Sequence, residues 1–243
     1  MLLRRFIQHA TFKRYGMHIH RNYHKKGSYS LKELFYDDNK LRHVLTQQEK
    51  GLTVKNSTIT GTMFGKQYSV MVLGIFDMMV YRNLLIDADP GNIYIKLTEQ
   101  GTIRFYINPK AVLSLNKLTA AEKNLIMHRL IEQHITPLFI RVGDMTNSKA
   151  KHLYSLVTHN LFQRSEFLKA RFPNQKDLIE SYKNSFISHE LVEGYTNPLH
   201  FTFRSVENAN GSIRYIRNHC CLEYLRHDGD LAACCSTCPH TNK

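Results

Sequence analysis

The chain contains no tryptophan, and it has no long apolar run. Its most apolar stretch, residues 70–76, is followed at once by Asp77, whereas a helix that spans a bilayer needs about 20 consecutive apolar residues. Residues 1–6 do not extend into the apolar core of a secretory signal either, because Gln8 and Lys13 follow them closely. We therefore expect a soluble, cytoplasmic protein.

The sequence also lacks the motifs of several enzyme classes. Neither G-x-G-x-x-G nor a P-loop occurs, so we expect no nucleotide or flavin site. No serine–histidine–aspartate set and no pair of carboxylates stands out, because the candidate side chains are isolated from one another in the sequence. We therefore predict no catalytic acid, base or nucleophile.

Acidic residues are scarce. The 20 Asp and Glu residues are outnumbered by 33 Lys and Arg, which gives a net charge of +13, and residues 1–31 contain no acid at all. A surface of this charge favours anionic partners such as nucleic acid, acidic lipid headgroups or a polyanionic small ligand, unless it is simply a basic, well-solvated face. The basic N-terminus would suit peripheral contact with the inner leaflet of the cell membrane.

The pattern of apolar residues predicts an α+β fold that is mainly helical, with short antiparallel β-hairpins. Between residues 59 and 85 apolar side chains recur every three or four positions, which predicts a buried helix whose methionines fill the core. Residues 93–97 and 103–107 alternate on either side of a Gly-containing turn and predict one hairpin. Residues 199–204 and 213–216 predict a second hairpin near the C-terminus.

Further helices are expected between the two hairpins. Thr119 and Glu122 form a capping box, and the helix that they begin is expected to kink or end at Pro137. Other helices are expected from Ser148 and over residues 177–193. The predicted organisation has three parts, namely a basic N-terminal helical region (1–58), a helical and hairpin domain (59–196), and a hairpin with a cysteine-rich C-terminal segment (197–243).

The cysteines are confined to one segment, as Cys220, Cys221, Cys234, Cys235 and Cys238. An odd count and the missing secretory signal disfavour a disulfide knot. Structural zinc would use the C-x-x-C pair, but the adjacent pair is a poor second half-site unless His219, His227 or His240 contributes. A [2Fe–2S] cluster needs four thiolates on two irons, and the two pairs can supply them.

Several segments together form a pattern. A strand follows Asn197-Pro-Leu199, and a second strand leads to Cys220-Cys-Leu-Glu-Tyr224 and then to Cys235-Ser-Thr-Cys-Pro239. Upstream, Thr62-Met-Phe-Gly-Lys-Gln-Tyr68 opens the apolar helix, and Gly91-Asn-Ile93 lies in the first hairpin. The pattern resembles the FhuF-type ferric-siderophore reductases over most of residues 59–239, and the cysteine segment is its specific part.

This resemblance implies a [2Fe–2S] cluster held by Cys220, Cys221, Cys235 and Cys238. Thirteen residues, 222–234, separate the two pairs, whereas about ten are usual for such ligand loops. The surplus Cys234 is therefore an alternative to Cys235 as the third ligand.

The resemblance also implies an enzyme that reduces a ferric siderophore by one electron and so releases Fe(II). Its electrons would come from an external reductase, ferredoxin or flavin-dependent donor. The chelate would dock on the 59–196 domain, and Arg204, Arg214 and Arg217, which flank the cluster segment, would attract it by their charge.

Two other functions stay open at this point. The net charge fits a zinc-stabilised nucleic-acid-binding protein, but two clean metal half-sites and any RGG or aromatic RNP-type stretch are missing, so we expect no nucleic-acid partner. Alternatively, the cluster serves an iron–sulfur electron carrier or redox sensor without chelate reductase activity.

Overall fold

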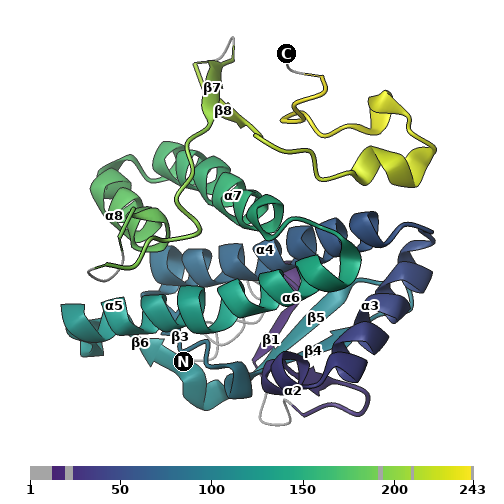
Figure 1. The fold of residues 1–243 in the computed structure, drawn as a ribbon. Helices are drawn as coiled ribbons and strands as arrows, with labels where there is room; N and C mark the ends of the chain where they lie inside the picture. Colours follow the sequence, from purple (N-terminus) through teal and green to yellow (C-terminus); the bar gives the residue numbers. More distant parts are fainter. Residues whose placement is uncertain (1–12, 20–23, 191–193, 209–210, 242–243) are drawn as a thin grey trace.

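The computed structural model describes residues 13–19, 24–190, 194–208 and 211–241. A long helix, α4 (Ser57–Arg82), lies at the centre and packs against most other elements (Figure 1). The other helices are α2 (Leu31–Tyr36), α3 (Asp38–Leu52), α5 (Ala120–His128), α6 (Thr136–Thr146), α7 (Ala150–Arg171) and α8 (Lys176–Ile187). The predicted fold class is confirmed, because helices dominate and the strands form short, mostly antiparallel pairs.

A four-stranded sheet covers one side of α4, in the order β1-β5-β4-β2. Its strands are β1 (Met17–Ile19), β2 (Tyr29–Ser30), β4 (Ile93–Leu97) and β5 (Ile103–Ile107). The predicted hairpin is confirmed, since β4 and β5 pair in antiparallel register with Ile95 opposite Phe105. The sequence pattern predicted helices before residue 58, but β1 and β2 are strands, too short to give a period-two signal. A second, two-stranded sheet pairs β3 (Leu84–Ile86) with β6 (Val112–Ser114).

Helix α4 is buried along nearly its whole length, as predicted. Asn56 caps its N-terminus by accepting hydrogen bonds from two backbone amides of the first turn. Met63, Met71 and Met79 are buried in the core, which confirms their role as apolar filler. Gly61 lets α6 approach closely, because a β-carbon there would lie 2.0 Å from the Thr146 hydroxyl oxygen.

The predicted capping box at Thr119 and Glu122 is confirmed at the start of α5. The α-helical hydrogen bonding ends at His128, and a π-helical segment, η4 (Arg129–Ile135), connects it to α6. Pro137 then lies in the first turn of α6, where its missing N–H leaves no partner unsatisfied. The wider turn thus accommodates the proline without ending the helical path.

The C-terminal hairpin consists of β7 (Arg204–Glu207) and β8 (Ile213–Ile216), so the predicted strand over residues 199–204 is wrong in position. Residues 199–203 pack on α7 instead of pairing with a strand. The Thr158 hydroxyl donates to the Leu199 carbonyl, and the Phe203 ring packs edge-on against Phe162. The alternation of apolar and polar residues over 199–203 therefore reflects packing against α7 and not pairing in a sheet.

No helix in the described part of the chain combines the length and the apolar character needed to cross a bilayer.

Candidate metal centre

The cysteines lie on an irregular C-terminal segment that folds back on itself. Strand β8 leads into Cys220 and Cys221, and two short 3₁₀ helices follow, η6 (Glu223–His227) and η7 (Leu231–Ala233). Leu222 and Asp228 bracket η6 in left-handed conformations, with φ of 58° and 53°, which reverse the chain direction. The reversal brings the second cysteine group back beside the first.

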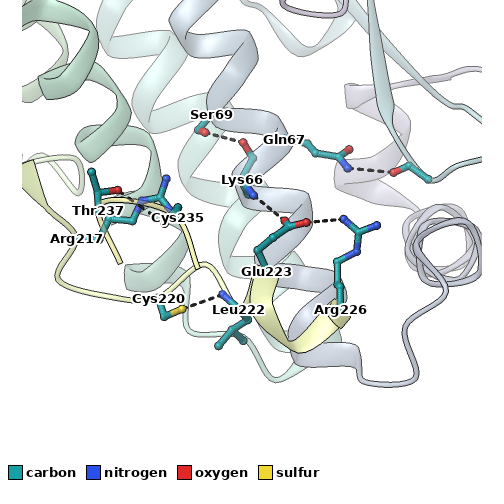
Figure 2. Close-up of polar contacts among 11 residues, drawn as sticks. Lys66, Gln67, Ser69, Arg217, Cys220, Leu222, Glu223, Arg226, Cys235 and Thr237 are labelled. Atoms are coloured by element: carbon teal, nitrogen blue, oxygen red, sulfur yellow. Dashed lines mark hydrogen bonds and ion pairs between the residues drawn. The ribbon is translucent and has the colours of Figure 1, made fainter. Parts of the chain in front are cut away.

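This segment is fastened to the body at η6. Glu223 accepts from Lys66 Nζ of α4 at 2.6 Å and from Arg226 Nη1 at 2.8 Å (Figure 2). The Leu222 side chain packs against a small apolar cluster, namely Leu52, Val54, Ile59 and Met63. An ion pair and an apolar contact therefore hold the start of the loop against α3 and α4.

The fold brings all four predicted ligands together. Cys220 Sγ lies 3.6 Å from Cys238 Sγ, and the Cys221 thiol lies close to those of Cys220 and Cys235. The surplus Cys234 thiol lies near Cys238. Cys220, Cys221 and Cys238 are buried, whereas Cys234 and Cys235 are partly exposed, and all five are free thiols. The site therefore has a buried side and a side that reaches the surface.

The surroundings of the sulfurs favour a thiolate at Cys221. Hydrogen bonds from Cys220 and then Cys235, aided by the positive charges of Arg217 and Lys66, hold the pKa of Cys221 well below its usual range. The pKa values of Cys220 and Cys235 are raised, in each case first because that thiol donates to Cys221. The thiolate is the metal-binding form of cysteine, and the lowered pKa favours that form at Cys221.

Two further N–H groups point at sulfur. The Leu222 backbone N–H donates to Cys220 Sγ at 3.3 Å, and Arg217 Nη1 donates to Cys235 Sγ at 3.2 Å (Figure 2). Such donors stabilise negative charge on cysteine sulfur, whether it is a free thiolate or a metal ligand.

The donors do not converge on a single point. Among the described residues, no group of three or more His, Cys, Asp or Glu side chains is arranged to hold one metal ion. Two of the three histidines considered as substitute ligands lie against other rings, His219 against His152 and His240 against Tyr224. The sulfur contacts therefore run pairwise along the cysteine group.

The three predicted arginines occupy different positions. Arg217 contacts Cys235, Arg214 Nη1 donates to the Ser236 carbonyl at 3.0 Å, and Arg204 is exposed on β7 opposite Ile216. Arg217 thus contacts a cysteine sulfur directly, while Arg214 stabilises the turn that carries the C-x-x-C pair.

Sequence reasoning missed two residues of the site, Lys66 and His159. The buried His159 on α7 accepts from Arg217 Nε at 3.3 Å, and its other ring nitrogen donates to the Tyr215 carbonyl at 2.8 Å. Burial and, second, the charge of Arg217 lower the pKa of His159 to about 4, so the ring is neutral. His159 therefore orients Arg217. A histidine within an apolar helix gives no sequence signal that distinguishes this role from simple packing.

Two open cavities flank the β7–β8 hairpin. One, of about 550 Å³, lies between α7 and the hairpin and is bordered by Lys169, Lys176 and Arg214. The other, of about 680 Å³, lies beside His219 and is bordered by Lys151, Tyr154 and Phe201. The second cavity includes His219, which precedes Cys220, and each cavity is bordered by at least one basic side chain.

Comparisons with known proteins add no assignment. No protein-family model matches this sequence, and no curated protein matches it either. The likeness to FhuF-type reductases therefore rests on the motif residues themselves.

Proposed function

We propose that this chain is a ferric-siderophore reductase in which Cys220, Cys221, Cys235 and Cys238 hold a [2Fe–2S] cluster. One observation carries the proposal. Four cysteines that the resemblance assigns as ligands, on two segments separated by thirteen residues, are brought close together at the edge of the folded body. Such a cluster supplies one electron at a time to a docked oxidant.

The donor set fits this group. Thiolates are the ligands that iron–sulfur clusters use, and two thiolates bonded at about 2.3 Å to one tetrahedral ion lie about 3.8 Å apart. The 3.6 Å separation of the Cys220 and Cys238 sulfurs is close to that value. A single zinc ion needs three or four convergent donors, whereas a two-iron cluster needs two pairs. The pairwise contacts favour the second arrangement.

Residues around the cysteines would balance the charge of the cluster, and basic residues would attract the ferric chelate. Arg217, Lys66 and the Leu222 N–H offset the negative charge of a thiolate-bound cluster, and the partly exposed Cys235 lies on the side from which an oxidant can approach. The positive charge of the chain, including Arg204 and Arg214, would attract an anionic ferric chelate.

Reduction of the bound iron would also release it from the siderophore. The chelate's Fe(III) gains one electron and becomes Fe(II), which hard oxygen donors hold far more weakly. An external donor would then supply a new electron to the protein: a reductase, a ferredoxin or a flavin-dependent protein. Such a protein would work in the cytoplasm, with the inner membrane face as a place to meet imported chelates.

The proposal is tested on protein purified without air. We expect about two irons and two sulfides per chain, a signal in electron paramagnetic resonance (EPR) after reduction, and an altered or lost signal when any of the four cysteines is changed to Ser. Cys234→Ser is the matched control and should keep the signal. A colourless protein with one zinc per chain would overturn the proposal.

Turnover separates a reductase from an electron carrier. The reduced protein is mixed anaerobically with a ferric siderophore, and Fe(II) is captured by a chromogenic chelator. Oxidation of the cluster should accelerate with siderophore concentration, one Fe(II) appearing per electron. If the siderophore does not accelerate oxidation, the protein is a carrier or sensor.

A further inference from the structure

The sulfur contacts follow an order that differs from the order of the cysteines in the sequence. Among the four proposed ligands, Cys220 Sγ lies 3.6 Å from Cys238 Sγ, and the Cys221 thiol lies close to those of Cys220 and Cys235. Two of these neighbour pairs, Cys220 with Cys238 and Cys221 with Cys235, each join the adjacent pair to the C-x-x-C pair. The third joins the two adjacent cysteines to each other.

Two ways of sharing four thiolates between two irons are compatible with the sequence. In the sequential arrangement the adjacent cysteines bind one iron and the C-x-x-C pair binds the other. In the crossed arrangement Cys220 and Cys238 bind one iron, while Cys221 and Cys235 bind the other. Thiolates on one tetrahedral ion stay about 3.8 Å apart, and thiolates on different irons are farther apart because the bridging sulfides lie between the metals.

The contacts favour the crossed arrangement. It keeps Cys220 beside Cys238 and Cys221 beside Cys235, and it separates only Cys220 from Cys221. The sequential arrangement would instead pull apart the Cys220 and Cys238 sulfurs, which lie 3.6 Å from each other, and would also separate Cys221 from Cys235. The crossed arrangement also needs less movement of the buried sulfurs, since Cys220 and Cys238 are 7% and 1% exposed and already touch.

We propose that the centre is crossed, with Cys220 and Cys238 on one iron and Cys221 and Cys235 on the other. The inference rests on the proposed [2Fe–2S] cofactor and specifies how this chain holds it. Each iron would then tie the end of β8 to the C-terminal turn, so that the loop over residues 222–234 is closed twice. Arg217, which donates to Cys235, would lie on the side of the Cys221 and Cys235 iron.

Mössbauer spectra of double variants in the oxidised state distinguish the two arrangements. If the centre is crossed, Cys220→Ser with Cys238→Ser places both oxygens on one iron, and the ⁵⁷Fe spectrum shows two unequal doublets of equal area. Cys220→Ser with Cys221→Ser then gives each iron one oxygen, and the two doublets nearly coincide. The opposite assignment of these two spectra would overturn the crossed arrangement.

A second measurement does not depend on the cluster. In iron-free Cys234→Ser protein, brief oxidation with diamide followed by alkylation converts neighbouring thiols to disulfides. Trypsin cleaves after Arg217 and Arg226, so that residues 218–226 carry the adjacent cysteines and residues 227–243 carry the C-x-x-C pair.

The crossed arrangement links these two peptides, and the mass spectrum shows a joined species with Cys220 bonded to Cys238. Two separate peptides, each with its own internal disulfide, would overturn it even where the double variants bind no iron. A wild-type protein that takes up no iron would instead overturn the proposed function, so the two failures are distinguishable.

Discussion

At the scale of single residues, Arg217 connects the sulfurs to the helical body. It donates to Cys235 Sγ and to His159, which in turn is fixed by the Tyr215 carbonyl. A cluster becomes more negative on reduction, so a cation that donates to one of its sulfurs stabilises the reduced state.

We expect Arg217→Gln to lower the reduction potential of the proposed cluster. A hydrogen bond to a charged group contributes about 1.5 kcal/mol, which for one electron corresponds to about 60 mV. A redox titration followed by EPR measures the change. Arg214→Gln removes the same charge from β8, three residues before Arg217, but loses a bond to the Ser236 carbonyl, so it serves as the control. Equal shifts in both variants would mean that the effect is long-range charge and not the contact with Cys235.

Residues of the site differ in how far the sequence predicts them. The cysteines could be found because thiols are rare and their spacing carries chemical meaning, and Arg217 could be found because it precedes them by a few positions. His159 and Lys66 could not be found, because each lies on a helix far from the cysteines in sequence. Their proximity depends on how α4 and α7 pack.

At the scale of elements, η6 is the point at which the cysteine segment contacts α4. The Lys66 and Glu223 side chains are 31% and 21% exposed, so their ion pair adds less than about 1 kcal/mol to global stability. Its effect on local opening of the loop is larger in relative terms, because few other contacts hold that loop.

We expect Glu223→Gln to increase amide hydrogen exchange over residues 222–233 by about fivefold, the factor that corresponds to 1 kcal/mol. Exchange within α4 should stay unchanged. Glu180→Gln is the matched control, because it breaks a similar ion pair with Lys169 between α7 and α8, together with a pair to Lys183 within α8. If both variants accelerate exchange in the cysteine segment, the Lys66–Glu223 pair has no specific role there.

Helices and strands could be predicted from the sequence where apolar residues repeat with a regular period over many positions. The helix α4 and the β4–β5 hairpin followed from their apolar spacing, since one surface of each faces the core. The strands β1 and β2 were missed because two or three residues give no pattern. Residues 199–203 were assigned to a strand because packing on α7 and pairing in a sheet both produce alternation.

At the scale of the whole molecule, the main apolar core and the cysteine group are separate. The core extends from Tyr15 to Leu199 and contains no cysteine, and the C-terminal segment that carries the cysteines (yellow) lies along the outside of the helical body (Figure 1). Near the centre of this core is a buried polar group. His134 contacts the Tyr68 hydroxyl through Nε2, and its Nδ1 donates to the Ala88 carbonyl at 2.8 Å.

His134 makes global stability depend on pH. Burial lowers its pKa from 6.5 to about 4, although the Ala88 carbonyl and Asp89 oppose this shift. The folded state therefore holds the ring neutral, and below pH 6.5 the unfolded chain binds a proton that the folded chain does not. Stability due to this group is complete above pH 6.5 and is lost progressively as the pH falls towards 4.

Between pH 7.5 and pH 5 the loss from His134 amounts to about 2 kcal/mol in the free energy of unfolding. We expect His134→Gln to be less stable than the wild type at pH 7.5, because Gln does not reproduce both ring contacts, but to lose about 2 kcal/mol less on acidification. Urea unfolding at the two pH values measures both quantities. His152 and His159, whose pKa values burial also lowers to about 4, remain in both proteins, so the difference between the two slopes belongs to position 134. Equal slopes would show that the pKa of His134 is the same in the folded and unfolded chain, and would contradict this prediction.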